Sequence, residues 1–233
     1  MWEADYHPAL RGWDSNQLTA ADLTPQAATR IRRRFFLAVG NKRRLIDKTP
    51  RNSVRVPFVN ELFPDATYVF LRRDGRDNTN SLINAWRTTR YRTYRLPEPH
   101  SIPGVDPLWW KFILYPGWRE DAHGPLEVVC ARQWLASNRG ALDASRAIQP
   151  RHWIDVRYED LVERPEAQIG RILAALDLPY DDALREKARS IAATPINVVT
   201  APEPGKWRRE NPDEIGSVLW LIEPVMRELG YEV

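Results

Sequence analysis

The sequence predicts an α/β fold with a mainly parallel sheet. Short segments typical of buried strands alternate along the chain with longer segments of helical periodicity. Such alternation is the pattern of strands joined by helical connections. The length of 233 residues suits a single hydrophobic core, because chains divide into several domains only beyond roughly 250 to 300 residues. We therefore expect one domain over residues 1–233.

The first half of the chain is expected to alternate between helices and strands. Thr24 and Pro25 are typical of an N-cap followed by proline at the first helical position, and Gly40 can end the same periodic segment. The elements predicted in order are a helix at Pro25–Val39, a strand at Arg44–Asp47, a helix at Asn52–Phe63, a strand at Thr67–Leu71 and a helix at Asp77–Arg87.

The second half opens with a segment of different character. Residues 88–125 are crowded with Tyr, Trp and Pro and show no sustained period, so we expect a long insertion or lid there. The elements predicted beyond it are a helix at Leu126–Ala147, a strand at His152–Tyr158, helices at Pro165–Leu176 and Asp181–Ala192, an irregular Pro-rich stretch at Thr194–Pro204 and a last helix at Pro212–Leu229.

Composition narrows the function classes. No apolar run approaches the roughly 20 residues of a membrane-spanning helix, and the single cysteine, Cys130, allows neither an internal disulfide nor a cysteine-rich metal site. The four histidines are scattered without metal-ligand spacing. The basic residues are interspersed with acids, for a net charge of only +3. We expect a cytoplasmic protein with no metal, no membrane association and no nucleic-acid partner.

The strongest signal for chemistry is the segment from Val69 to Ser81, which runs from a strand through a tight turn into a helix. Ligands of open α/β sheets lie beyond the carboxyl ends of the strands, where helix N-termini favour anions. Arg73, just past the strand, and Ser81, in the helix, are placed to donate hydrogen bonds to a phosphate. The alternative is a structural turn in which Asp77 caps the helix and Asp74 pairs with an arginine.

This segment resembles the 3′-phosphate-binding section of the sulfotransferase superfamily, in which an arginine at a strand end and a serine eight residues later bind 3′-phosphoadenosine 5′-phosphosulfate (PAPS). The blocks Asp47–Asn52 and Glu61–Ala66 are similar to bacterial sulfotransferases and, more distantly, to protein-tyrosine sulfotransferases. The resemblance runs from about Lys42 to the C-terminus, apart from residues 88–125. It implies a three-layer fold like that of the P-loop NTPases, and sulfuryl transfer that converts PAPS to adenosine 3′,5′-bisphosphate.

The resemblance also implies roles outside that segment. Tyr158 matches a tyrosine that contacts the nucleotide, and Lys206 and Trp207 match a C-terminal element that closes over it. Lys48 matches the lysine that balances charge on the departing phosphate, chemistry that requires no metal. Structural interpretations are also open: Tyr158 as a core residue, Lys48 as a surface lysine at a turn, and the Lys-Trp element as a loop pinned by its tryptophan.

One part of the family's pattern is missing. Sulfotransferases begin with a central strand and a Gly-rich loop that holds the 5′-phosphosulfate, whereas the only early glycine here, Gly12, follows no strand. We expect the chain to be an N-terminally shortened version of a longer protein, with exposed apolar side chains and backbone edges where the strand is absent. No general base is assigned, because Glu3, Asp5 and His7 in the corresponding region are each expected to be surface residues.

Two other classes of function compete with sulfuryl transfer. A noncatalytic nucleotide-binding or scaffolding relative would keep only the 3′-phosphate half of the site. A nucleoside or sugar kinase would need a Walker loop and Mg²⁺ ligands, which the sequence does not contain. The expected acceptor is a small molecule or a peptide, and Trp109, Trp110, Tyr115 and Trp118 fit an aromatic acceptor or a packed lid equally well. The oligomeric state is not predicted.

Overall fold

The computed structural model describes residues 3–42, 44–190 and 203–233. Within these ranges the chain forms two compact units, the first drawn from residues up to 66 and from 91–144, the second from 67–90 and from 145 onward. The chain passes between the units three times. Each unit is therefore assembled from segments far apart in the sequence.

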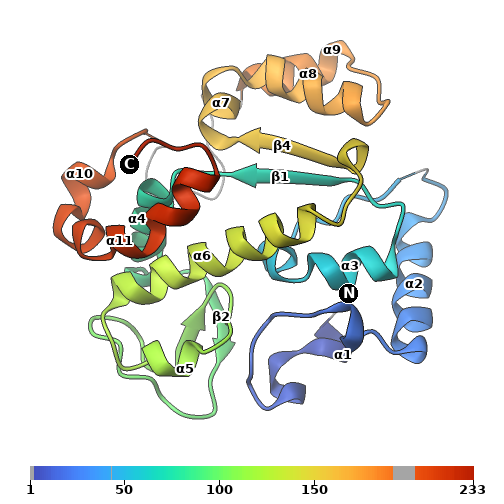
Figure 1. Ribbon diagram of the computed structural model, residues 1–233. Coiled ribbons are helices and arrows are strands. Elements are labelled where there is room, and N and C mark those ends of the chain that lie inside the picture. Colours follow the sequence, from blue (N-terminus) through green and yellow to red (C-terminus); the bar gives the residue numbers. More distant parts are fainter. Residues whose placement is uncertain (1–2, 43, 191–202) are drawn as a thin grey trace. The chain divides into compact units, whose positions relative to one another are not determined.

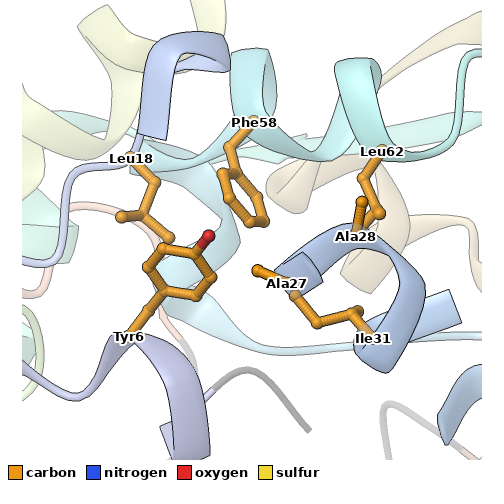
Figure 2. Packing of buried hydrophobic residues seen from close by; sticks show 7 residues of the cluster. All are labelled: Tyr6, Leu18, Ala27, Ala28, Ile31, Phe58 and Leu62. Atoms are coloured by element: carbon orange, nitrogen blue, oxygen red, sulfur yellow. The ribbon is translucent and has the colours of Figure 1, made fainter. Parts of the chain in front are cut away.

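Helices at the start of the chain build one core of the first unit. They are α1 (Glu3–Tyr6), α2 (Pro25–Val39) and α3 (Val56–Leu62), and the single 3-10 turns η1 (Pro8–Arg11), η2 (Ala20–Asp22) and η3 (Pro50–Val54) lie between them. Helix α2 has its predicted bounds, with the Thr24 hydroxyl accepting the N–H of Ala27 at 3.2 Å. Figure 2 shows the buried side chains that interlock here: Tyr6, Leu18, Ala27, Ala28, Ile31, Phe58 and Leu62.

Two elements predicted near this core are wrong. Residues 44–49 form no strand, and no strand of the described residues pairs with them, which leaves Ile46 86% exposed. The single helix expected at Asn52–Phe63 is divided into η3 and α3. Pro57 explains the division, because proline has no N–H to bond a carbonyl one turn earlier and is tolerated only in the first turn of a helix.

Residues 88–125 contain more regular structure than their sequence indicates. Strands β2 (Arg92–Arg95) and β3 (Trp109–Lys111) pair antiparallel, and the short helix α5 (Trp118–Asp121) follows. Trp110 is fully buried, and its ring centroid lies 4.8 Å from that of Trp118. These aromatic side chains therefore pack an interior together with the long helix α6 (Leu126–Ser145), and a lid role for the segment stays a prediction.

The second unit is built on a pair of parallel strands. β1 (Tyr68–Arg72) and β4 (Trp153–Arg157) pair from Tyr68↔Trp153 to Arg72↔Arg157, as the two parallel arrows of Figure 1 show. Helix α4 (Gly75–Arg87) follows β1, and the 3-10 turn η4 (Pro150–His152) precedes β4. The helices after β4 are α7 (Tyr158–Glu163), α8 (Pro165–Ala175), α9 (Asp182–Ser190), α10 (Trp207–Glu210) and α11 (Pro212–Glu228).

Most predictions for this unit are confirmed within a few residues at each element's ends. Ala192 and the stretch from Thr194 to residue 202 lie outside the described residues. The parallel sheet comprises two strands among the described residues, with Ile154 and Val156 buried on β4. Their register partners on β1, Val69 and Leu71, are 45% and 49% exposed. The expected apolar exposure is therefore present on β1, while its backbone edge toward β4 is paired.

Candidate functional site

The Asp74 carboxylate bonds within the turn between β1 and α4, and the Glu159 carboxylate accepts the backbone N–H of Asp74 at 3.0 Å. Asp74 is the N-cap of α4: its side chain accepts the N–H of Arg76 at 2.8 Å and binds the Arg76 guanidinium at 3.0 and 2.6 Å. The structural alternative therefore holds for Asp74, which pairs with an arginine. The helix cap is Asp74 rather than Asp77, because Asp77 already lies in the first turn of α4.

Three of the residues predicted to bind the nucleotide meet beside this turn. Arg73 Nη1 donates a hydrogen bond to Ser81 Oγ at 3.1 Å, and Ser81 Oγ donates to the Asp77 carbonyl at 2.9 Å. The Arg73 guanidinium carbon lies 4.7 Å from the ring centroid of Tyr158. Arg73 follows β1 and Tyr158 follows β4, so the group lies at the carboxyl ends of both parallel strands.

This arrangement has the chemistry of an anion site. A guanidinium presents a planar set of donors that matches phosphate oxygens, and a hydroxyl beside it adds a further donor. Both groups lie near the N-terminal half of α4, a helix of 13 residues whose dipole favours negative charge at that end. The aromatic face of Tyr158 holds the Arg73 side chain by a cation–π contact.

The Lys-Trp element comes to the same helix from the far end of the chain. The backbone N–H of Gly205 donates to Asp77 Oδ2 at 2.8 Å, and the N–H of Trp207 donates to Asp77 Oδ1 at 3.5 Å. Lys206 is 6% exposed, and its Nζ lies 3.7 Å from Glu210 Oε1. Trp207 is half-buried. Because backbone N–H groups also bind Asp77, the element is attached to α4 by more than its tryptophan.

A cavity of about 290 Å³ opens beside these contacts. Trp207 and Tyr231 contribute aromatic walls, and the charged lining residues are Arg76, Arg157, Arg208, Asp74, Asp77 and Glu159. Arg157 Nε is buried and makes no hydrogen bond within the described part of the chain; it lies 4.0 Å from Glu159 Oε2. The cavity therefore combines three guanidinium groups with three carboxylates in its lining.

Lys48 belongs to the first unit and is exposed. It belongs to the irregular segment 44–49 and follows Asp47. The Asp47 carboxylate accepts hydrogen bonds from the Thr49 hydroxyl at 3.2 Å and from the Asn52 amide at 3.0 Å. These bonds hold the turn that carries Lys48. Within the same unit, Arg51 Nη1 donates to the Tyr94 hydroxyl at 2.7 Å.

The acidic and imidazole groups near the N-terminus are engaged in structural contacts. Asp5 accepts hydrogen bonds from Arg30 at 2.7 Å and from Arg34 at 2.8 Å. The His7 ring accepts the N–H of Ala9 at 3.2 Å. The two arginines occupy both oxygens of Asp5, so this carboxylate is poorly placed to take a proton from an acceptor.

Sequence reasoning missed the role of Asp77 at this site. A signal was present, because Asp77 is an acidic residue in the first turn of a helix that begins at a predicted anion site. Its partners lie 128 and 130 residues away, however, and no local pattern identifies them. Among the described residues there is no group of three or more His, Cys, Asp or Glu placed to hold a metal, and no helix long and apolar enough to cross a membrane.

A sequence model described as the sulfotransferase family matches residues 6–102 and 112–182. The match begins well before Lys42 and includes most of residues 88–125, so the resemblance is wider in both places than the motifs alone indicated. Residues after 182, among them Lys206 and Trp207, lie outside the match. Arg73, Ser81 and Tyr158 lie inside it.

Individual relatives agree with this assignment. The chain is 25% identical over 204 residues to protein-tyrosine sulfotransferase A of Caenorhabditis elegans, covering 81% of this chain and 45% of that protein. It is 32% identical over 148 residues to nodulation protein NoeE of Sinorhizobium fredii, covering 64% and 31%. It is 24% identical over 241 residues to the protein-tyrosine sulfotransferase of Drosophila melanogaster, covering 94% and 42%. The chain thus spans less than half the length of each relative.

The structure resembles the sulfotransferase domain from the curacin biosynthetic pathway, with a TM-score of 0.53 and 16% identity over 88% of this chain and 68% of that domain. At this identity the likeness concerns the fold, and it confirms the predicted α/β class. Because the sequence model of the family matches well over half of the residues, the chain belongs to the sulfotransferase family.

Proposed function

We propose that the protein transfers a sulfuryl group from PAPS to a hydroxyl or amine acceptor by in-line displacement. The observation that carries this proposal is the grouping of Arg73, Ser81 and Tyr158 at the carboxyl ends of β1 and β4. In the reaction, a bond forms between the acceptor atom and sulfur while the bond from sulfur to the 5′-phosphate oxygen breaks, and the acceptor loses its proton to a base.

The residues of the second unit fit the nucleotide part of PAPS. Arg73 and Ser81 would donate to the 3′-phosphate, and the Tyr158 ring, which packs on Arg73, would contact the nucleotide. Lys206 and Trp207 would close over it. Arg157, which lines the adjoining cavity, would add a further guanidinium.

Lys48 is proposed to stabilise the charge that develops on the departing 5′-phosphate. A lysine suits this role because its ammonium is a compact charge with three donors on a flexible stem. Exposure on a turn held by Asp47 leaves its amine accessible.

The acceptor is proposed to be a small molecule or a peptide. Two of the relatives are named protein-tyrosine sulfotransferases and one is named a nodulation protein, and those names differ in what they say of the acceptor. The group that accepts the sulfuryl group is therefore proposed only as a hydroxyl or an amine. Screening phenols, sugars and tyrosine-containing peptides with PAPS, with adenosine 3′,5′-bisphosphate as the measured product, would define it.

The cofactor proposal is tested by calorimetric titration with adenosine 3′,5′-bisphosphate and with adenosine 5′-monophosphate, which lacks the 3′-phosphate. Arg73→Ala should weaken binding of the bisphosphate by roughly 10- to 100-fold, because a hydrogen bond to a charged group contributes about 1.5–3 kcal/mol. The same substitution should leave the weaker binding of the monophosphate nearly unchanged. Without a 3′-phosphate, the contact that Arg73 would make is already missing, so removing the guanidinium costs no further affinity.

Arg189→Ala is the matched control, because Arg189 is an exposed arginine of the same unit that pairs with Glu166 at 3.0 Å. It should bind both nucleotides like the original chain. Equal losses for both nucleotides in Arg73→Ala would contradict the assignment of Arg73 to the 3′-phosphate. A folded chain that binds neither nucleotide would instead favour a noncatalytic relative.

A further inference from the structure

The segment around the Lys-Trp element is attached to α4 at two points. At the first, the Asp77 carboxylate accepts the backbone N–H groups of Gly205 and Trp207. At the second, Glu210 Oε2 at the end of α10 accepts the side-chain amides of Asn80 at 2.9 Å and Asn84 at 2.8 Å. The first attachment includes the first residue of α10, and the second is made by its last residue, Glu210.

The Asp77 attachment is unusual in its burial. Asp77 is 4% exposed, and burial raises the pKa of its carboxyl, although the N–H groups of Gly205 and Trp207 oppose this rise. A buried carboxylate is costly unless hydrogen bonds compensate it. The nearby Arg76 guanidinium instead donates to the Asp74 carboxylate. The backbone of residues 205–207 is therefore an important part of what keeps Asp77 satisfied.

The geometry of the loop makes this contact specific. Gly205 has φ +75°, a conformation that L side chains rarely adopt, and this turns its N–H and that of Trp207 toward the same carboxylate. Between them, Lys206 is directed into the interior, with Nζ 3.7 Å from Glu210 Oε1. The two attachments therefore fix the backbone on both sides of Lys206 and Trp207.

We propose that Asp77 is a positioning residue, whose carboxylate holds residues 205–207 against the first turn of α4 so that Trp207, which lines the cavity, is presented to the nucleotide. This inference rests on the proposed function for the nucleotide contact, but the attachment itself is a property of the chain alone. It assigns Asp77 a role separate from that of Arg73 and Ser81, which would contact the phosphate directly. Asp77 itself would touch no ligand.

The test compares Asp77→Asn with the original chain in two measurements. Asparagine has nearly the same shape, but it replaces one acceptor oxygen with an amide that cannot accept the second N–H. We expect the amides of Gly205 and Trp207 to lose at least tenfold protection from hydrogen exchange, while β1 and β4 keep theirs. We also expect the Kd for adenosine 3′,5′-bisphosphate and the KM for PAPS to rise about tenfold, with kcat changed less than threefold.

Asp213→Asn is the matched control, since Asp213 is an exposed acid in the first turn of α11, and it should change neither measurement. Unchanged exchange in Asp77→Asn would overturn the attachment, and lost protection with unchanged nucleotide affinity would overturn its role in presentation. If Asp77→Asn shows no cooperative unfolding, Asp77→Ser is judged by the same criteria. An original chain that binds no nucleotide contradicts the proposed function, and hydrogen exchange then decides the attachment alone.

Discussion

Two aspartates of one turn, Asp74 and Asp77, take different roles at the scale of single residues. Asp74 bonds locally, to Arg76 within its own turn, and so starts α4. Asp77 turns toward residues that follow it by more than 120 positions. Both are acids near a helix N-terminus, where the dipole favours them. Local sequence thus accounts for the first role, and only the path of the distant segment accounts for the second.

His100 gives a prediction for pH dependence at the same scale. Its side chain is buried, Nδ1 accepts the N–H of Ile102 at 3.3 Å, and Nε2 lies 3.4 Å from the Trp109 carbonyl, which fits a neutral ring with the proton on Nε2. Burial lowers the pKa of His100 below 6.5. The folded chain thus binds fewer protons than the unfolded chain, so the free energy of unfolding should fall as pH drops below about 6.5.

Urea unfolding at pH 7.5, 6.5 and 5.5 checks this against His100→Asn, whose side-chain oxygen keeps an acceptor for Ile102 but does not titrate. The stability advantage of the original chain over the variant should shrink as the pH falls. A constant difference across the three pH values would show that His100 does not contribute this dependence.

At the scale of elements, two helical glycines differ in how closely other backbone approaches them. Gly140 of α6 lies close to neighbouring backbone, and Gly216 of α11 does not. A Cβ on Gly140 of α6 would lie 3.0 Å from the Ser53 carbonyl oxygen and 3.5 Å from Val54 Cα, both backbone atoms of η3. A Cβ on Gly216 of α11 would meet nothing within 4 Å. The two helices therefore respond oppositely to the same added methyl group.

Gly140→Ala should lower the free energy of unfolding by about 1 kcal/mol, because overpacking against backbone costs roughly 1–3 kcal/mol and exceeds the gain in helix propensity. Gly216→Ala should raise it by about 0.5–1 kcal/mol, since only the propensity gain applies at this exposed position. Chemical denaturation of both variants is the measurement. Stabilisation by Gly140→Ala would mean that η3 moves aside without cost.

At the scale of the whole molecule, the proposed catalytic cation and the proposed nucleotide contacts are different residues. The cation is Lys48, and the contacts are Arg73, Ser81, Tyr158, Lys206 and Trp207. Binding of the nucleotide and stabilisation of the leaving phosphate should therefore be separable by substitution. Removing a nucleotide contact should mainly raise the Kd for the nucleotide, and removing the catalytic cation should mainly lower kcat.

Lys48→Ala should lower kcat by about 100-fold, the order found when one group that stabilises transition-state charge is removed. Its Kd for adenosine 3′,5′-bisphosphate should change less than that of Arg73→Ala. Lys42→Ala, at an exposed lysine shortly before it in the chain, is the control and should keep normal turnover. Steady-state kinetics with PAPS and a responsive acceptor provide the measurement, and an unchanged kcat in Lys48→Ala would remove its catalytic role.

Features that depend on neighbours along the chain could be predicted from local patterns. The helix at Pro25–Val39 follows from its Thr-Pro start, and β1, α4 and β4 follow from strand and helix periodicity. The pair of Arg73 and Ser81 could be predicted as well, because eight residues across one turn and one helix leave few ways to place them. The family match agrees with these local patterns.

Features that need a partner far away in the sequence could not be predicted from local patterns. Residues 44–49 have the composition of a strand but no strand among the described residues pairs with them, and a strand gains its hydrogen bonds from a neighbour. Trp110 and Trp118 pack an interior because other segments surround them. Asp77 meets Gly205 because two segments far apart in the sequence are folded together, and this proximity is a result of packing that no local pattern contains.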